Sequence, residues 1–123
     1  MDFNISHSGE FILAVFAVGM DIGVDVQEMA ECPDYREIAE NFYTAEEAED
    51  VKNEGPDLFF QYWAAKEAYV KALGIGLGRG MDFFSVRNEK IAEKDKKDQD
   101  WFLYPVRIKG YAAYVAAHEK GDR

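Results

Sequence analysis

The chain has 123 residues, a length that suits one compact domain spanning residues 1–123. Apolar residues make up 48% and aromatic residues 15%, which excludes an intrinsically disordered protein. The single cysteine, Cys32, excludes an intramolecular disulfide and a multi-cysteine metal site. No apolar run approaches the roughly 20 residues of a membrane helix, and residues 1–10 do not resemble a secretory signal. We therefore expect a cytoplasmic protein without a membrane partner.

Charge is distributed unevenly along the chain. The net charge of −10 argues against nucleic-acid binding. Residues 1–60 carry 15 acidic and 2 basic side chains, whereas residues 61–123 carry 9 acidic and 12 basic ones. An anionic ligand should therefore be bound by the second half, beginning with Lys66. The acidic half is interpreted most simply as a solvated surface, with an acidic interaction domain as the alternative.

The first part of the chain predicts strands. Residues 11–18 are rich in β-forming side chains and too few for a stable helix, so they predict a buried strand that ends at Gly19. Residues 20–26 predict a turn and a second short strand. Gly23 within them indicates a bulge or a close backbone approach.

Two short helices are predicted next. Asp34 is suited to cap a helix over residues 35–42. Thr44 and Glu47 have the spacing of a capping box, which predicts a second helix through residue 51.

The strongest helix prediction covers residues 57–73, with Gly74 as its terminator. Apolar side chains recur there at three- and four-residue steps. They are Leu58, Tyr62, Ala65, Tyr69 and Ala72, flanked by Phe59, Trp63 and Val70.

The last part predicts strands again, over residues 83–87, 101–108 and 111–117, with a mobile loop over 89–100. Lys109 and Gly110 suit a tight hairpin turn. Strands that flank a central helix without a βαβ rhythm predict an α+β fold, in which an antiparallel sheet packs on the long helix.

The long helix carries charged side chains close to aromatic ones. Glu67 and Lys71 are four residues apart and share a face with Trp63, whereas Lys66 lies about 100° around the helix. A surface ion pair explains this spacing. A functional cluster is the alternative, because charges held near apolar surface are more often functional.

Asp25 lies inside a short apolar strand, where an unpaired carboxylate is costly to bury. It either faces solvent or binds a cation. Mg²⁺ typically takes one or two protein carboxylates and completes its coordination with water and phosphate oxygens. Asp25 together with Glu67 fits that requirement.

Two further segments are considered as candidates for phosphate binding. Residues 4–8, Asn-Ile-Ser-His-Ser, bear hydroxyl and imidazole donors, which either contact phosphate or bond the backbone in a turn. The glycines of residues 74–80 close a helix rather than open one, and no Gly-Lys-Ser/Thr occurs. Rossmann and P-loop sites are therefore excluded.

Three blocks occur in a recognisable order. They are Asn-Ile-Ser-His-Ser at residues 4–8, Gly-Val-Asp-Val-Gln at 23–27 and Trp-x-x-Lys-Glu-Ala-x-x-Lys at 63–71. Together they resemble the signature blocks of the 4′-phosphopantetheinyl transferases, of the surfactin-synthetase-activating type. The resemblance implies that family's fold over nearly the whole chain. It also implies Mg²⁺-dependent transfer of 4′-phosphopantetheine from coenzyme A to a serine of an apo acyl or peptidyl carrier protein, which releases adenosine 3′,5′-bisphosphate.

The resemblance also implies roles for particular residues. By motif position, Asp25 and Glu67 ligate the metal, and Glu67 is the candidate base for the incoming serine. The family's second block usually ends in an acid that adds another metal contact. Gln27 stands there and is a weaker ligand, so water or Glu28 is an alternative.

The remaining roles implied by the resemblance concern phosphate. Lys66 and Lys71 neutralise phosphate charge, and Ser6 and His7 contact the phosphates of coenzyme A. Basic residues suited to docking an acidic carrier are Arg79, Arg87, Lys94, Lys96 and Lys97.

Relatives of this type carry an additional N-terminal lobe, and this chain begins at the last motif of that lobe. By analogy with the related acyl-carrier-protein synthases, which build active sites between subunits, we expect a homo-oligomer. The alternative to an enzyme is a non-catalytic remnant of the same fold that binds coenzyme A or a carrier protein.

Overall fold

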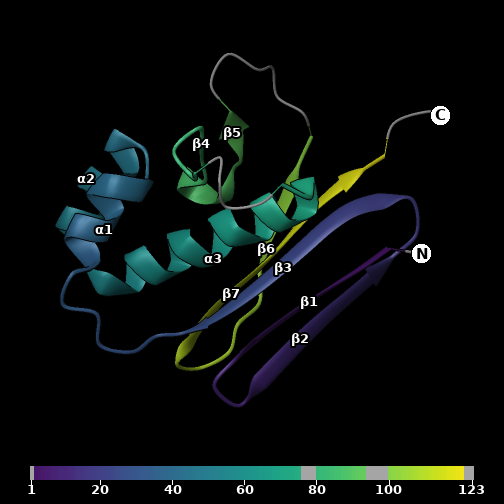
Figure 1. Cartoon of the computed structure of the whole chain (residues 1–123), viewed down its shortest axis with the longest axis horizontal. Helices are drawn as coiled ribbons and strands as arrows, with labels where there is room; N and C mark the ends of the chain where they lie inside the picture. Colours follow the sequence, from purple (N-terminus) through teal and green to yellow (C-terminus); the bar gives the residue numbers. More distant parts are fainter. Residues whose placement is uncertain (1, 76–79, 94–99, 121–123) are drawn as a thin grey trace.

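The computed structural model of the chain describes residues 2–75, 80–93 and 100–120 (Figure 1). The chain begins with a hairpin of two antiparallel strands, β1 (Asp2–Ser8) and β2 (Phe11–Ala17). A longer strand, β3 (Met20–Glu28), follows. Three helices come next: α1 (Tyr35–Phe42), α2 (Ala45–Glu54) and α3 (Pro56–Leu73). The remaining strands are β4 (Phe84–Ser85), β5 (Ala92–Glu93), β6 (Phe102–Pro105) and β7 (Tyr111–Glu119).

The central sheet has the order β3-β7-β6, and both of its ladders are antiparallel. α3 crosses one face of this sheet and packs on both β3 and β7, as Figure 1 shows. Apolar side chains of α3 and alternate residues of β7 belong to one buried core. The predicted α+β fold, with an antiparallel sheet on a long helix, is therefore confirmed.

Gly23 permits the close approach of β3 to α3. A Cβ atom at this position would collide with the backbone oxygen of Ala68 and lie 2.6 Å from the backbone nitrogen of Ala72. The predicted close backbone approach is confirmed, while β3 runs continuously through residues 20–28 rather than forming a turn and a short strand. The contact also fixes which side of β3 faces α3, namely the side of residues 23, 25 and 27.

The hairpin joins β3 through side chains rather than through a backbone ladder. Three oxygens on the inner face of β1, spaced two residues apart, accept hydrogen bonds from alternate backbone N–H groups of β3. The bonds are Val24 N to Asn4 Oδ1 at 2.9 Å, Val26 N to Ser6 Oγ at 3.1 Å and Glu28 N to Ser8 Oγ at 2.9 Å. These bonds satisfy backbone donors of β3 that would otherwise lack a partner.

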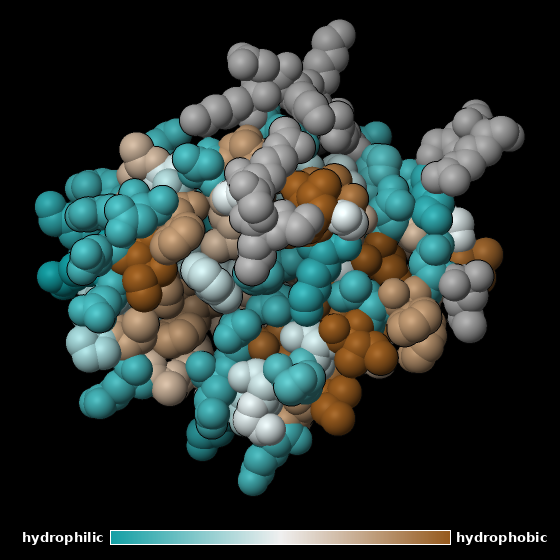
Figure 2. All heavy atoms as spheres, in the orientation of Figure 1, coloured by the Kyte–Doolittle hydropathy of each residue, from teal (hydrophilic) through white to brown (hydrophobic). Residues whose placement is uncertain are grey.

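The prediction that residues 11–18 form a buried strand is wrong in one respect. The strand exists, but the outer face of the hairpin is exposed because no described element covers it. Figure 2 shows hydrophobic side chains gathered where β1 and β2 lie, at the lower right. The exposed large apolar residues of this hairpin are Phe3, Ile5, Phe11, Ile12 and Phe16.

The predicted helices are present with small differences. Asp34 is the N-cap residue of α1, yet its side chain makes no capping bond, so its predicted capping role is wrong. The capping box of Thr44 and Glu47 is confirmed at α2, which continues to Glu54. Gly74 ends α3 in the left-handed conformation at a φ of 72°.

The last third is less regular than predicted. Residues 83–87 form only the short β4 and enter a 3₁₀ turn, and the strand predicted at 101–108 is reduced to β6. The expected turn at Lys109 and Gly110 joins β6 to β7, and the φ of Gly110 is 82°. Residues 94–99 of the predicted mobile loop lie outside the described residues. None of the described helices is apolar and long enough to cross a membrane.

Candidate active site

Asp25 is the centre of a polar cluster between β3 and α3. It lies on the face of β3 turned toward α3, and it is only 4% exposed. Gln27 Nε2 donates to Oδ2 at 3.1 Å, and Ser6 Oγ and Lys71 Nζ each donate to Oδ1 at 3.4 Å. Burial nevertheless raises the pKa of the Asp25 carboxyl, because it outweighs these hydrogen bonds and the charge of Lys71. Asp25 is therefore a paired but desolvated carboxylate.

Lys71 and Glu67 bring α3 into the same cluster. Lys71 Nζ also donates to the backbone oxygen of Val24 at 3.0 Å, which ties the last turns of α3 to β3. Glu67 lies one turn before Lys71 on the same side of α3. Burial raises the pKa of Glu67, the negative charge of Asp25 raises it further, and Lys71 opposes both. The structure thus brings together two carboxylates from segments distant in the sequence, with a lysine beside them.

The donor set of this cluster fits a hard divalent cation. Two carboxylates and the side-chain amide of Gln27 supply oxygen ligands, the type that Mg²⁺ prefers. A cation there would also relieve the repulsion by which Asp25 raises the pKa of Glu67. The described residues contain no group of three or more His, Cys, Asp and Glu side chains that could hold a metal. Water and substrate oxygens would have to complete the coordination, as they commonly do for Mg²⁺.

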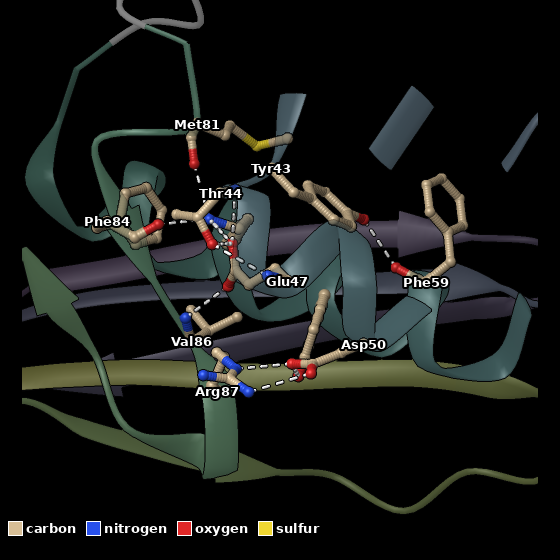
Figure 3. A network of polar contacts seen from close by, with 11 residues as sticks. Tyr43, Thr44, Glu47, Asp50, Phe59, Met81, Phe84, Val86 and Arg87 are labelled. Atoms are coloured by element: carbon tan, nitrogen blue, oxygen red, sulfur yellow. Dashed lines mark hydrogen bonds and ion pairs between the residues drawn. The ribbon is translucent and has the colours of Figure 1, made fainter. Parts of the chain in front are cut away.

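Lys66 does not belong to this cluster. It is fully buried, and its Nζ atom lies 2.7 Å from Glu47 Oε1, which is equally buried. The same ammonium donates to the backbone oxygens of Met81 at 2.7 Å and Phe84 at 2.6 Å. Figure 3 labels these two acceptor residues and Glu47. Three close partners use all three protons of the ammonium group. This geometry gives no support to the expected contact of Lys66 with phosphate.

The partner of Lys66, Glu47, was not among the functional residues that the sequence indicated. Its second oxygen accepts a hydrogen bond from Val86 N at 2.7 Å, and its first also accepts from Thr44 N at 3.1 Å (Figure 3). Lys66 and Glu47 therefore join α2, α3 and the segment 81–86 in one network. The capping-box spacing was the one signal in the sequence, and it pointed only to a helix terminus.

Ser6 and His7 point to opposite faces of β1, because successive strand residues alternate. Ser6 is buried, donates to Asp25 and accepts from Val26 N. His7 lies on the exposed outer face of the hairpin. Only Ser6 of this pair therefore belongs to the cluster around Asp25.

The predicted docking residues are mostly not described. Arg79, Lys94, Lys96 and Lys97 lie outside the described residues. Arg87 is described, and its guanidinium lies 2.7 Å from Asp50 and 2.9 Å from Glu46. It links the 3₁₀ turn to α2.

Comparison with known proteins assigns the family. The family model of the 4′-phosphopantetheinyl transferase superfamily matches residues 21–116, which include Asp25, Gln27, Glu67 and Lys71. The chain belongs to this superfamily. The match covers all of β3 except Met20, the three helices and most of β7, and so includes β3 and α3, which position the candidate site.

Individual transferases of this superfamily are similar over part or all of the chain. The chain is 38% identical over 89 residues to the 4′-phosphopantetheinyl transferase Sfp of Bacillus subtilis, an alignment that covers 69% of this chain and 38% of Sfp. It is 29% identical over 144 residues to the rat L-aminoadipate-semialdehyde dehydrogenase-phosphopantetheinyl transferase, which covers 98% of this chain and 47% of the rat protein. The chain thus spans less than half the length of these relatives.

A solved structure supports the fold. The holo-(acyl-carrier-protein) synthase of Bacillus anthracis, solved in complex with coenzyme A, superimposes with a TM-score of 0.62 at 23% identity. The alignment covers 82% of this chain and 96% of that protein. The α+β architecture is therefore shared with a transferase of similar length.

Proposed function

We propose that this protein transfers the 4′-phosphopantetheine group of coenzyme A to a serine hydroxyl of an apo acyl or peptidyl carrier protein. The reaction depends on Mg²⁺ and releases adenosine 3′,5′-bisphosphate. The observation that carries the proposal is the convergence of Asp25, Glu67 and Lys71 at the positions of the family's motifs. The names of the relatives support transfer of phosphopantetheine, and the coenzyme A complex of the similar synthase supports the donor.

The metal would be held by the carboxylates of Asp25 and Glu67, with the Gln27 amide as a weaker ligand. When bound, Mg²⁺ orients the diphosphate of coenzyme A and stabilises charge on the leaving group. The serine oxygen forms a bond to the phosphorus that carries pantetheine. The bond from that phosphorus to the bridging diphosphate oxygen breaks, and its electron pair leaves on adenosine 3′,5′-bisphosphate. No protein nucleophile is required, because phosphoryl-type transfer depends mainly on positioning and charge.

Glu67 accepts the proton of the incoming serine, directly or through water. Lys71 supplies a fixed positive charge for the phosphate oxygens and holds Asp25 in place. Ser6 orients Asp25 from the other side through its hydroxyl.

A second function deserves a test because of one residue. Gln27 stands where the family usually has an acid, and a neutral amide binds Mg²⁺ less strongly than a carboxylate. The alternative is therefore a protein that binds coenzyme A or a carrier protein without turnover. Joint retention of Asp25, Glu67 and Lys71 favours the enzyme.

Several broader expectations belong to the same proposal. Residues 1–123 act as one domain in the cytoplasm, and the chain self-associates into a homo-oligomer. The exposed apolar face of the β1–β2 hairpin supports self-association, because soluble monomers rarely expose large contiguous apolar surface.

The proposal is tested by mass spectrometry of an apo carrier protein incubated with this protein, coenzyme A and Mg²⁺. We expect a mass gain equal to one phosphopantetheine group. Glu67→Gln should abolish the gain. Glu28→Gln should preserve it, because Glu28 is exposed and lies on the face of β3 opposite to Asp25, so it cannot replace Gln27 as a ligand. Coenzyme A binding without a mass gain on several carriers would favour the non-catalytic alternative.

A further inference from the structure

The β1–β2 hairpin lies along the free edge of β3 (Figure 1). In the described residues it forms no backbone ladder with β3, whose ladder is with β7. Asn4 Oδ1 accepts a hydrogen bond from Val24 N at 2.9 Å. Ser6 Oγ accepts one from Val26 N at 3.1 Å. The hairpin therefore holds the backbone of β3 immediately before and after Asp25.

Ser6 also reaches the side chain of Asp25. Its oxygen already accepts the Val26 N–H group, so its hydroxyl proton is free to be donated, and Asp25 Oδ1 lies 3.4 Å away. Both residues are almost fully buried, with exposed fractions of 7% and 4%. At 3.4 Å this is a long hydrogen bond, so the backbone bonds to Val24 and Val26 are the stronger part of the attachment.

Lys71 approaches the same stretch of β3 from α3. Its Nζ atom donates to the backbone oxygen of Val24 at 3.0 Å and to Asp25 Oδ1 at 3.4 Å. Val24 is thus bonded to the hairpin through its N–H group and to α3 through its oxygen. Because both backbone groups of one strand residue point to the same side, the two bonds lie together at the free edge of β3.

The attachment through side chains leaves the Val24 oxygen available to Lys71. In a backbone ladder of either kind, a neighbouring strand would bond both the N–H group and the oxygen of such an edge residue. Asn4 instead offers an acceptor to the N–H group alone. The hairpin and α3 can therefore both contact Val24 and Asp25, two consecutive residues of β3.

We propose that Asn4 and Ser6 are positioning residues of the metal site, which fix Asp25 through the backbone of β3. Asp25 is thereby held in place beside Lys71 and Glu67. The inference rests on the proposed function, because it takes Asp25 as a ligand of the metal. It gives the hairpin a role in metal binding although the hairpin supplies no ligand. It also replaces the phosphate contact that the family resemblance implies for Ser6.

Electron paramagnetic resonance with Mn²⁺, with coenzyme A present and again with it absent, measures the metal site without requiring turnover. Ser6→Ala and Asn4→Ala should each weaken Mn²⁺ binding by roughly three- to tenfold, as expected for the loss of one hydrogen bond. Ser6→Thr keeps the hydroxyl and should restore most of the affinity. Ser8→Ala is the matched control and should bind Mn²⁺ like the wild type. Ser8 makes the same type of bond, to Glu28 N at 2.9 Å, but this bond does not adjoin Asp25.

Hydrogen exchange of the wild type gives a second readout that needs no variant of the hairpin. Coupling between two sites acts in both directions, so saturating Mg²⁺ should slow exchange of the Val24 and Val26 amide protons by a similar factor, roughly three- to tenfold. Asp25→Asn should abolish this response. Exchange of these two amides that does not respond to Mg²⁺ would show that the hairpin bonds are structural only, and would overturn the proposal.

Unchanged Mn²⁺ affinity in Ser6→Ala and Asn4→Ala would also overturn it, as would an equal loss in Ser8→Ala or a wild type that binds no Mn²⁺ in either condition. Weaker binding of adenosine 3′,5′-bisphosphate to Ser6→Ala in metal-free buffer, at unchanged Mn²⁺ affinity, would instead assign Ser6 to a phosphate contact.

The positioning role and the proposed transfer can fail separately. If the variants lose metal affinity as expected while the wild type modifies no carrier, the positioning role stands and the transfer fails. If the wild type modifies a carrier while Ser6→Ala and Asn4→Ala bind Mn²⁺ normally, the transfer stands and the positioning role fails.

Discussion

Lys66 and Glu67 are neighbours in the sequence, but their side chains serve different parts of the molecule. Successive helix residues point about 100° apart, so Lys66 reaches Glu47 of α2 while Glu67 faces the side of Asp25. A buried ion pair is costly to break because the remaining charge has no partner. Lys66 therefore stabilises the packing of α3 that aims Glu67 toward β3.

This assignment predicts the effect of removing the lysine. Lys66→Met should lower the free energy of unfolding by about 3–5 kcal/mol, measured by urea denaturation, because Glu47 is left charged and buried. The double variant Lys66→Met with Glu47→Gln should recover part of that loss, since Gln can keep the capping box without a charge. Wild-type stability in Lys66→Met, combined with weaker binding of coenzyme A, would instead return Lys66 to the phosphate site.

The sequence predicted which residues are candidates for the site better than it predicted which side chains surround them. The motif spacing selected Asp25, Glu67 and Lys71, which the fold brings together. The resemblance also assigned Lys66 to phosphate, although the helical spacing put it on a different face from Glu67 and Lys71. Spacing shows which face of a helix a lysine occupies, but not which element packs on that face. Glu47 was missed for the same reason, since its partners Lys66 and Val86 are distant in the sequence.

β3 and α3 are the two elements that position the candidate site. Their spacing depends on Gly23, where the backbone of α3 occupies the space that a Cβ atom would need. Asp25 is two residues further along β3 on the same face, so a shift of α3 at Gly23 would change its position relative to Glu67. The close contact therefore connects packing to the proposed chemistry.

Gly23→Ala should destabilise the protein by about 1–3 kcal/mol, the usual cost of excess volume in a packed interior. It should also reduce the transfer rate, because α3 must move away from β3. Gly19→Ala is the control: it introduces strain at a φ of 70° in open space, so stability should fall without a comparable loss of activity. Equal activity losses in both variants, measured at a temperature where both are folded, would argue against positioning by this contact.

Elements with a strong apolar periodicity, such as α3, could be predicted from the sequence. The exposure of the β1–β2 hairpin could not. The prediction for α3 rested on apolar side chains at helical spacing and on Gly74, and both features operate locally. β2 was expected to be buried because it is almost wholly apolar. Its outer face is exposed because burial depends on what the rest of the molecule provides, which local sequence does not encode.

The edge of strand β2 in the β1–β2 hairpin is exposed and uncharged, although the chain carries a net charge of −10. Within the described residues β2 pairs only with β1, and β2 has no charged side chain. Antiparallel pairing of β2 with a second copy about Ala14 would place Ile12 opposite Phe16 of the other copy. An unprotected edge strand of this kind is a ready template for pairing. The proposed self-association is therefore best assigned to this hairpin.

Light scattering at assay concentration should give a mass at least twice that of the 14.0 kDa chain. Joint substitution Ile12→Lys and Phe16→Lys should lower the mass to that of the monomer, because the two side chains are 73% and 61% exposed in the single chain. Tyr104→Lys, at an exposed aromatic residue of β6, should leave the assembly intact. A wild-type monomer at all concentrations would refute the assignment.

The central claim is that Asp25 and Glu67 hold one divalent cation together. Electron paramagnetic resonance with Mn²⁺ in place of Mg²⁺ tests it directly, by counting free ions in the presence of coenzyme A. We predict one bound ion for the wild type and at least about tenfold weaker binding for Asp25→Asn and for Glu67→Gln, with Glu28→Gln unchanged. Equal Mn²⁺ affinity in all four proteins, or no binding by the wild type, would contradict the claim.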